Sequence, residues 1–297
     1  MPTKRRTHPL NQSPLYKLGS RGKLCRLLGI TTSELRAVSK GDALYREFDI
    51  PKKSGGSRHV ENPARPLKLV QARLARRLAA ITPPDYLYCP VKGRCYVSNA
   101  ARHVGNRVVR CLDIKSFFPN TPGRRVFWFY RSVLGCSSDL AGRLTTLSTY
   151  KGHLPTGSPL SPILAYFAYY DVWGRVAALC AAKGYTLTIY VDDLTISGAR
   201  VSDADIWLVK RELHRAGLHY HKEKVFRDRP AEVTGVIVGR EGVAPPNRQR
   251  LKLHAARHNV RELEGNARAG ALSRVAGLNA QLAQIDRQNN KLLRPAE

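Results

Sequence analysis

A pair of adjacent acids between two apolar, β-prone runs constrains this chain more than any other feature. The stretch Thr186-Leu-Thr-Ile-Tyr-Val-Asp-Asp-Leu-Thr-Ile-Ser197 alternates apolar and polar side chains on both sides of the acids. This period of two predicts a β-hairpin with Asp192 and Asp193 at its tip. Successive side chains of a strand point to opposite faces, so both acids serve one site only if the turn re-aims one of them. An isolated Asp-Asp pair is more often a polar turn.

A third acid argues for a metal site. Asp113 ends another apolar run, residues 108–114, and is followed by Phe117-Phe118-Pro119. Carboxylates gathered at the ends of neighbouring strands oppose each other's ionisation, and cations remove that repulsion. Two Mg²⁺ ions about 3.5–4 Å apart can activate an attacking hydroxyl and stabilise a leaving pyrophosphate. Asp113, Asp192 and Asp193 are therefore predicted to hold two Mg²⁺ ions and to catalyse nucleotidyl transfer.

These acids resemble the catalytic motifs of the reverse transcriptases, whose motif A aspartate and Tyr-x-Asp-Asp box match Asp113 and residues 190–193. The resemblance implies an α+β right-hand polymerase fold with fingers, a palm built on an antiparallel sheet, and a helical thumb. We expect N-terminal helices and fingers over 1–105 and the palm over 106–240, with a fingers-side insertion near 120–150. The thumb is expected over 241–297. The resemblance also adds the backbone carbonyl of Ile114 to the metal ligands.

The charge of the chain predicts a polyanionic partner. Fifty Lys and Arg against 22 acids give +28 over 297 residues, far more than solubility requires. An anionic membrane is the rival partner, but no stretch resembles an amphipathic anchor, and the apolar stretch 163–182 carries charges that suit a buried helix. The six cysteines form no Cys-x-x-Cys pair, and the N-terminus lacks an apolar signal core. We expect reduced thiols in a cytoplasmic protein that binds no membrane.

Two segments are candidates for binding the incoming nucleotide. Residues 45–63 predict a hairpin with a Ser-Gly-Gly-Ser tip that carries Lys52, Lys53 and Arg58. These cations are either a solvated basic edge or, as the resemblance implies, a clamp for the triphosphate. The loop 154–162 is a helix entry that resembles motif B, so Thr156 and Gly157 are expected at the nucleotide. Thr156 stands where glutamine is frequent, which leaves the backbone at Gly157 as the firmer contact.

Two further residues are given a role by the resemblance. Phe117 and Phe118 would usually both be core residues. However, Phe118 matches the steric gate beneath the sugar, provided that a turn at 116–117 re-aims it.

Residues 217–224 resemble motif D, in which Lys224 would donate a proton to the departing pyrophosphate. Lys222 remains an alternative.

Two short motifs place the chain near the retron reverse transcriptases. Asn99 and His103 stand one helical turn apart in Asn-Ala-x-x-His, and residues 233–235 read Val-Thr-Gly. Alone, the first pair is more often a structural hydrogen bond; together the motifs distinguish retron enzymes from other bacterial relatives. Basic residues follow in the predicted thumb. The predicted RNA-binding set is Asn99, His103, Val233, Thr234, Gly235, Arg248, Arg250 and Lys252.

The resemblance implies RNA-templated synthesis of DNA from dNTPs on a cognate structured non-coding RNA. The product would be an RNA–DNA hybrid, msDNA, primed from a guanosine 2′-hydroxyl, with a role in anti-phage defence. Host RNase H is the expected trimming partner, and any effector is expected on a separate chain. The alternatives are a group II intron or diversity-generating reverse transcriptase, and a non-catalytic RNA-binding protein that kept the fold.

Overall fold

A five-stranded sheet forms the centre of the molecule. The structure is a computed structural model and describes residues 7–52 and 55–293. The strands lie in the order β3-β5-β6-β4-β7, and every neighbouring pair is antiparallel except β3 and β5. The predicted antiparallel palm sheet is thus confirmed apart from one short parallel edge. The strands are β3 (Leu87–Cys89), β4 (Val108–Ile114), β5 (Thr186–Tyr190), β6 (Asp193–Gly198) and β7 (Tyr220–Arg227).

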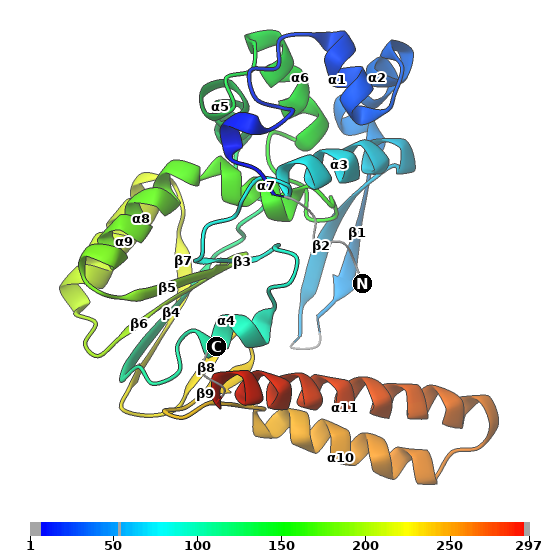
Figure 1. The fold of residues 1–297 in the computed structure, drawn as a ribbon. Helices are drawn as coiled ribbons and strands as arrows, with labels where there is room; N and C mark the ends of the chain where they lie inside the picture. Colours follow the sequence, from blue (N-terminus) through cyan, green and yellow to red (C-terminus); the bar gives the residue numbers. More distant parts are fainter. Residues whose placement is uncertain (1–6, 53–54, 294–297) are drawn as a thin grey trace.

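Two helices, α8 (Tyr170–Ala182) and α9 (Asp203–Arg215), cover one face of this sheet (Figure 1). In α9, Ile206, Val209 and Leu213 are buried, the spacing of a helix with one apolar face. The buried helix expected over 163–182 is divided into α7 (Ser161–Ala168) and α8, because Tyr169 between them has a non-helical backbone.

A layer of helices lies above the sheet in Figure 1. The capping box predicted at Thr31 and Glu34 is present, since each side chain accepts a hydrogen bond from the other's backbone N–H. One continuous apolar core joins this layer to the sheet. The layer contains α1 (Arg21–Leu28), α2 (Thr32–Val38), α3 (Arg65–Leu78), α5 (Gly123–Trp128), a π-helical turn (Phe129–Val133), α6 (Ser138–Ser148) and α7, with 3₁₀ turns at Leu10–Gln12 and Gly41–Leu44.

A largely exposed hairpin extends from the helical layer (Figure 1). Its strands, β1 (Tyr45–Pro51) and β2 (Ser57–Pro63), pair along their whole length. The hairpin predicted over 45–63 is therefore confirmed.

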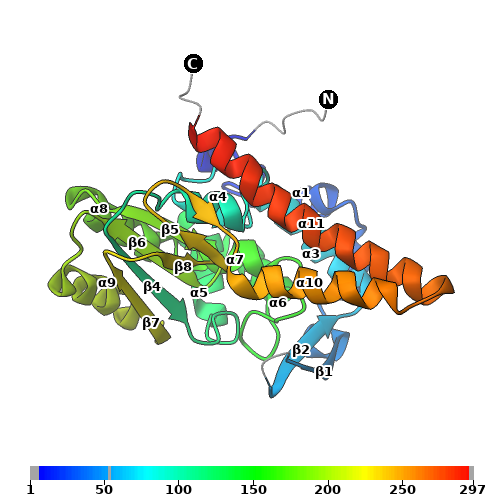
Figure 2. The same cartoon turned by 90° about the horizontal axis from the view of Figure 1, so that it is seen from below.

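The C-terminal part is an arm of two antiparallel helices on a small sheet. Strands β8 (Ala231–Val233), β9 (Val236–Val238) and β10 (Val243–Ala244) form the sheet. Helices α10 (Asn247–Arg261) and α11 (Gly265–Leu293) lie side by side in Figures 1 and 2. Ile285 of α11 is fully buried in a second core together with residues of α4 (Tyr96–Ala101) and β8. The thumb was expected to begin at 241, a position that lies between β9 and β10 of the small sheet, whereas the two helices of the arm begin at Asn247.

No helix in the described parts of the chain has both the length and the apolarity to cross a membrane.

Candidate active site

The predicted hairpin is present, and its turn is strained. Tyr190 pairs with Asp193, so β5 and β6 are joined by only Val191 and Asp192. Val191 has φ of 60°, a left-handed conformation that a β-branched residue rarely adopts and that costs about 1–3 kcal/mol. Such a two-residue turn matches the twist of a hairpin. It brings Asp192 to the tip directly beside Asp193, as the sequence required.

Strand register places Asp113 opposite Asp193. Strand β4 lies between β6 and β7, and Asp113 pairs with Asp193 on one side and with Lys222 on the other. Directly opposed residues of antiparallel strands share a face. On that face Asp113 and Asp193 line a pocket of about 540 Å³ together with Lys222 and Lys224. The three acids predicted to act together are thus brought together.

The electrostatics of the three acids favour a bound cation. Burial raises the pKa of Asp192, and the Asp113 carboxylate adds to the rise. Burial, with help from the Asp192 and Asp113 carboxylates, raises the pKa of Asp193 to about 6. Carboxylate oxygens are the ligands that Mg²⁺ prefers, so these residues fit the expected ions. In the described part of the chain no three His, Cys, Asp or Glu side chains lie close enough to form a ready-made metal site.

Asp193→Asn is expected to change how stability depends on pH in EDTA. Because folding raises this pKa from 3.8 to about 6, the folded protein binds the proton more tightly than the unfolded one. The resulting stability is present below the ordinary value and is lost as pH rises through about 6. Between pH 3.8 and about 6, the melting temperature of the variant should fall less than that of the wild type. Mg²⁺ should raise the melting temperature of the wild type more than that of the variant. The exposed Asp85→Asn is the control, and parallel curves for wild type and Asp193→Asn would contradict the expectation.

Both candidate lysines line the pocket, in different places. Lys222 lies opposite Asp113, whereas Lys224 lies opposite Cys111, two residue pairs further along the strands and on the same face. The charge of Lys224 partly offsets the raised pKa of Asp193. Both lysines therefore lie beside the carboxylates, and both stay candidates for the lysine of motif D.

The motif B loop contacts the hairpin strand β2. Gly157 donates its N–H to the Glu61 carbonyl at 3.1 Å, and a Cβ on Gly157 would lie 2.6 Å from that oxygen. The hydroxyl of Thr156 accepts from the Glu61 N–H and donates to the His59 carbonyl, each at 3.1 Å. The absence of a side chain at Gly157 therefore lets the backbone of the motif B loop lie directly against β2. The O–H donor of Thr156 is used by that strand, and a contact of its remaining lone pair with a nucleotide stays a prediction.

Glu61 and His153 were missed by the sequence analysis. The carboxylate of Glu61 is buried and contacts His153 Nε2 at 2.8 Å and the Thr156 N–H at 3.2 Å. The available signal was the alternation at the end of β2, where Glu61 and Pro63 both take inward positions. Together these contacts fix the hairpin to the loop that precedes α7.

The hairpin carries Arg58 to the site. Arg58 is exposed, yet its charge acts on Asp192 and partly offsets the raised pKa of that carboxyl. Lys52 is also exposed, near the tip. The third expected cation, Lys53, lies outside the described residues.

The turn predicted after motif A re-aims the phenylalanine pair. Ser116 has φ of 48°, which interrupts strand alternation directly after β4. Phe117 is 4% exposed and stacks against Tyr169, so its expected core role is confirmed. Phe118 is only half-buried. Its role as a gate stays a prediction.

The two short motifs contact each other across the fold. The Asn99 amide donates to the Thr234 hydroxyl at 3.3 Å, and that hydroxyl donates to the Tyr96 carbonyl at 3.0 Å. Thr234 and Gly235 form the β8–β9 turn with φ of 46° and 82° and line the carboxylate pocket. Val233 is fully buried, and Asn99 is 1% exposed. Of the residues that these two short motifs specify, only Thr234 and Gly235 are therefore placed at a surface that RNA can reach.

His103 does not face RNA. It is fully buried, and its Nδ1 and Nε2 lie 2.7 and 2.8 Å from the hydroxyls of Ser197 and Thr188. Burial lowers the pKa of His103 to about 3, so the ring is neutral. These contacts contradict direct binding of RNA and assign His103 to holding β5 and β6, which carry the acids.

The three basic residues predicted on the arm are not equivalent. Arg248 pairs with Glu232 through two hydrogen bonds, one of them 2.9 Å long, so its guanidinium is engaged within the protein. Arg250 and Lys252 are exposed. Arg250 lies about 200° around α10 from Arg248. A duplex along one face of the helix would therefore not meet all three.

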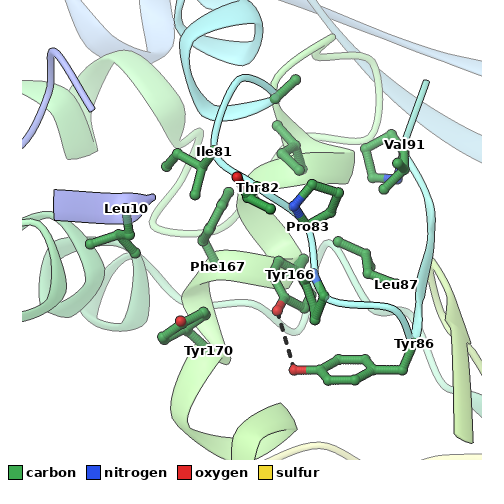
Figure 3. A pocket seen from close by; sticks show the side chains of 14 residues that line it. Leu10, Ile81, Thr82, Pro83, Tyr86, Leu87, Val91, Tyr166, Phe167 and Tyr170 are labelled. Atoms are coloured by element: carbon green, nitrogen blue, oxygen red, sulfur yellow. Dashed lines mark hydrogen bonds between the residues drawn. The ribbon is translucent and has the colours of Figure 1, made fainter. Parts of the chain in front are cut away.

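A separate apolar pocket lies away from the carboxylates. Its volume is about 250 Å³, and aliphatic side chains, prolines and aromatic rings line it (Figure 3). The hydroxyls of Tyr86 and Tyr166 lie 3.4 Å apart within it. None of the predicted site residues that the structure describes lines it. It plays no part in the site described above.

Comparisons with known proteins find one family and several relatives. The family model described as "Reverse transcriptase (RNA-dependent DNA polymerase)" matches residues 50–238, a span that contains all three acids and the hairpin cations. The retron Mx65 reverse transcriptase of Myxococcus xanthus is 33% identical over 270 residues, which cover 81% of this chain and 62% of that protein. The retron Se72 reverse transcriptase of Salmonella heidelberg (strain 579083-10) is 30% identical over 203 residues, which cover 66% of this chain and 51% of that protein.

A third relative shows the same pattern. The retron Ec48 reverse transcriptase of Escherichia coli is 26% identical over 263 residues, which cover 81% of this chain and 64% of that protein. The chain thus spans between 51% and 64% of the length of these three relatives.

Proposed function

The chain belongs to the reverse transcriptase (RNA-dependent DNA polymerase) family, and we propose that it is a retron-type enzyme that synthesises DNA on an RNA template. The observation that carries the proposal is the register that sets Asp113 opposite Asp193, with Asp192 in the adjoining turn. A protein that only binds RNA gains nothing from three mutually repelling, half-buried carboxylates.

The proposed mechanism gives each group a task. Two Mg²⁺ ions, held by Asp113, Asp192, Asp193 and the Ile114 carbonyl, would activate the 3′-hydroxyl and stabilise the pyrophosphate leaving group. The hairpin cations Lys52, Lys53 and Arg58 hold the triphosphate through charge-assisted hydrogen bonds. Lys222 or Lys224 protonates the departing pyrophosphate. The Gly157 loop acts by fixing the hairpin.

The proposed substrates and partners follow from the retron relationship. The substrates are dNTPs and a cognate structured non-coding RNA, primed from a guanosine 2′-hydroxyl to give an RNA–DNA product, msDNA. The net charge of +28 supports a nucleic-acid partner, and all six cysteines are free thiols, as suits a cytoplasmic protein. Host RNase H, a separate effector and a role in anti-phage defence complete the proposal.

Incorporation of labelled dNTP on an RNA template tests the polymerase activity. Synthesis is expected with Mg²⁺ and should stop when EDTA removes the metal. Tight RNA binding without incorporation under any divalent metal would instead identify a non-catalytic RNA-binding protein. Sequencing nucleic acid that copurifies with the protein tests the retron assignment, because one structured RNA joined to its own DNA copy is expected.

A further inference from the structure

Residues of α1 and α3 line a basic pocket. Both helices belong to the helical layer, away from the strands that carry the carboxylates (Figure 1). The pocket has a volume of about 410 Å³. Four arginines and one histidine are among the residues that line it, and no acidic side chain of the described part of the chain does. The lining residues are His8, Arg26, Arg73, Arg76 and Arg77, with Pro14, Leu27, Leu28, Gly29 and Ala80.

Two of the arginines are held in place by the end of α1. Arg73 donates to the Leu28 carbonyl and to the Gly29 carbonyl, the latter at 2.9 Å, and Arg77 donates to the Leu27 carbonyl at 3.3 Å. The C-terminus of a helix carries partial negative charge, which favours these cations. Gly29 has φ of 60°, and a Cβ there would lie 3.3 Å from Arg73 Nη1. The glycine therefore ends the helix and makes room for the guanidinium.

The other two arginines have no such structural role. Arg26 and Arg76 are exposed, and neither makes a side-chain hydrogen bond or ion pair with any residue that the structure describes. The charge of Arg73 acts on Glu34, but Glu34 does not line the pocket. Four guanidinium groups thus converge on one concavity without a counter-charge inside it.

The chemistry of the pocket selects phosphate. A guanidinium presents a planar fork of N–H donors that matches two phosphate oxygens, and fixed guanidinium groups lose little entropy on binding. We propose that this arginine pocket binds backbone phosphates of RNA outside the active site. The site holds the RNA while synthesis proceeds at the carboxylates, and its existence does not depend on the polymerase activity.

The test replaces the two arginines that make no structural contact. Arg26→Gln/Arg76→Gln is compared with Arg124→Gln/Arg200→Gln, which removes two exposed arginines elsewhere. A labelled RNA stem-loop is titrated by fluorescence anisotropy while excess unlabelled primer–template hybrid fills the active site. The pocket variant is expected to bind at least about tenfold more weakly, and its salt dependence should flatten by about 0.7–0.9 log unit for each lost phosphate contact. The control variant, the melting temperature and extension of a short primer should stay unchanged.

Two competitors identify the ligand. Sodium pyrophosphate at matched ionic strength represents free phosphate, and polyglutamate represents an acidic protein partner. RNA is supported if neither displaces the stem-loop from the wild type more strongly than from the pocket variant. Stronger displacement from the wild type by either competitor, or equal stem-loop affinity and salt dependence in both double variants, would overturn the proposal.

Discussion

Asp192→Asn is expected to abolish DNA synthesis while RNA binding survives. Asp192 lies in the two-residue turn, and its backbone carbonyl accepts the Ile114 N–H at 2.9 Å. That bond does not involve the side chain, so the turn should persist in the variant. Loss of a metal-binding carboxylate removes several kcal/mol of transition-state stabilisation, which corresponds to at least about a thousandfold in rate.

The measurement is single-turnover incorporation of one dNTP on an RNA template, with RNA affinity determined on the same protein. The control is Asp139→Asn, an exposed acid on α6 that pairs with Arg143 on the surface. Rates within tenfold of the wild type would contradict a metal-binding role for Asp192. Loss of RNA affinity in parallel with activity would instead indicate that the turn had collapsed.

The features of this site that could be predicted are those determined by short stretches of the sequence. The strand pattern around Asp192, the acid at the end of β4 and the turn before Phe118 each depend on a few consecutive residues. Register then followed, because slipping β4 by one residue would turn Asp113 away from the face that it shares with Asp193. The resemblance to reverse transcriptases indicated that Asp113 and residues 190–193 belong to one active site.

The parts that escaped prediction depend on contacts between distant residues. His103 was assigned to RNA because Asn-Ala-x-x-His resembles a retron motif, whereas its hydrogen-bond partners Thr188 and Ser197 lie 85 and 94 residues away. Glu61 likewise resembles an ordinary strand acid until the motif B loop folds against it. The parallel strand β3 has only three residues, too few for a periodicity to be recognised.

Phe118→Ala is expected to admit ribonucleotides while DNA synthesis remains measurable. The ring is half-buried just after the turn at Ser116, so it has an exposed side in the region that follows Asp113. A ring beneath the incoming sugar excludes a ribose 2′-hydroxyl by overlap, whereas an apolar pocket discriminates against an added hydroxyl only about a hundredfold. Removing the ring should therefore lower the preference for dNTP over rNTP toward the roughly hundredfold level that an apolar pocket alone provides.

The neighbouring Phe117 provides the matched control for this prediction. It is buried against Tyr169 and Trp173, so Phe117→Ala should chiefly lower the free energy of unfolding, by about 3–5 kcal/mol. Single-turnover rates with dNTP and rNTP, together with urea unfolding of both variants, separate the two roles. If Phe118→Ala keeps the wild-type sugar preference, or loses as much stability as Phe117→Ala, then Phe118 is a core residue and the sugar is selected by another group.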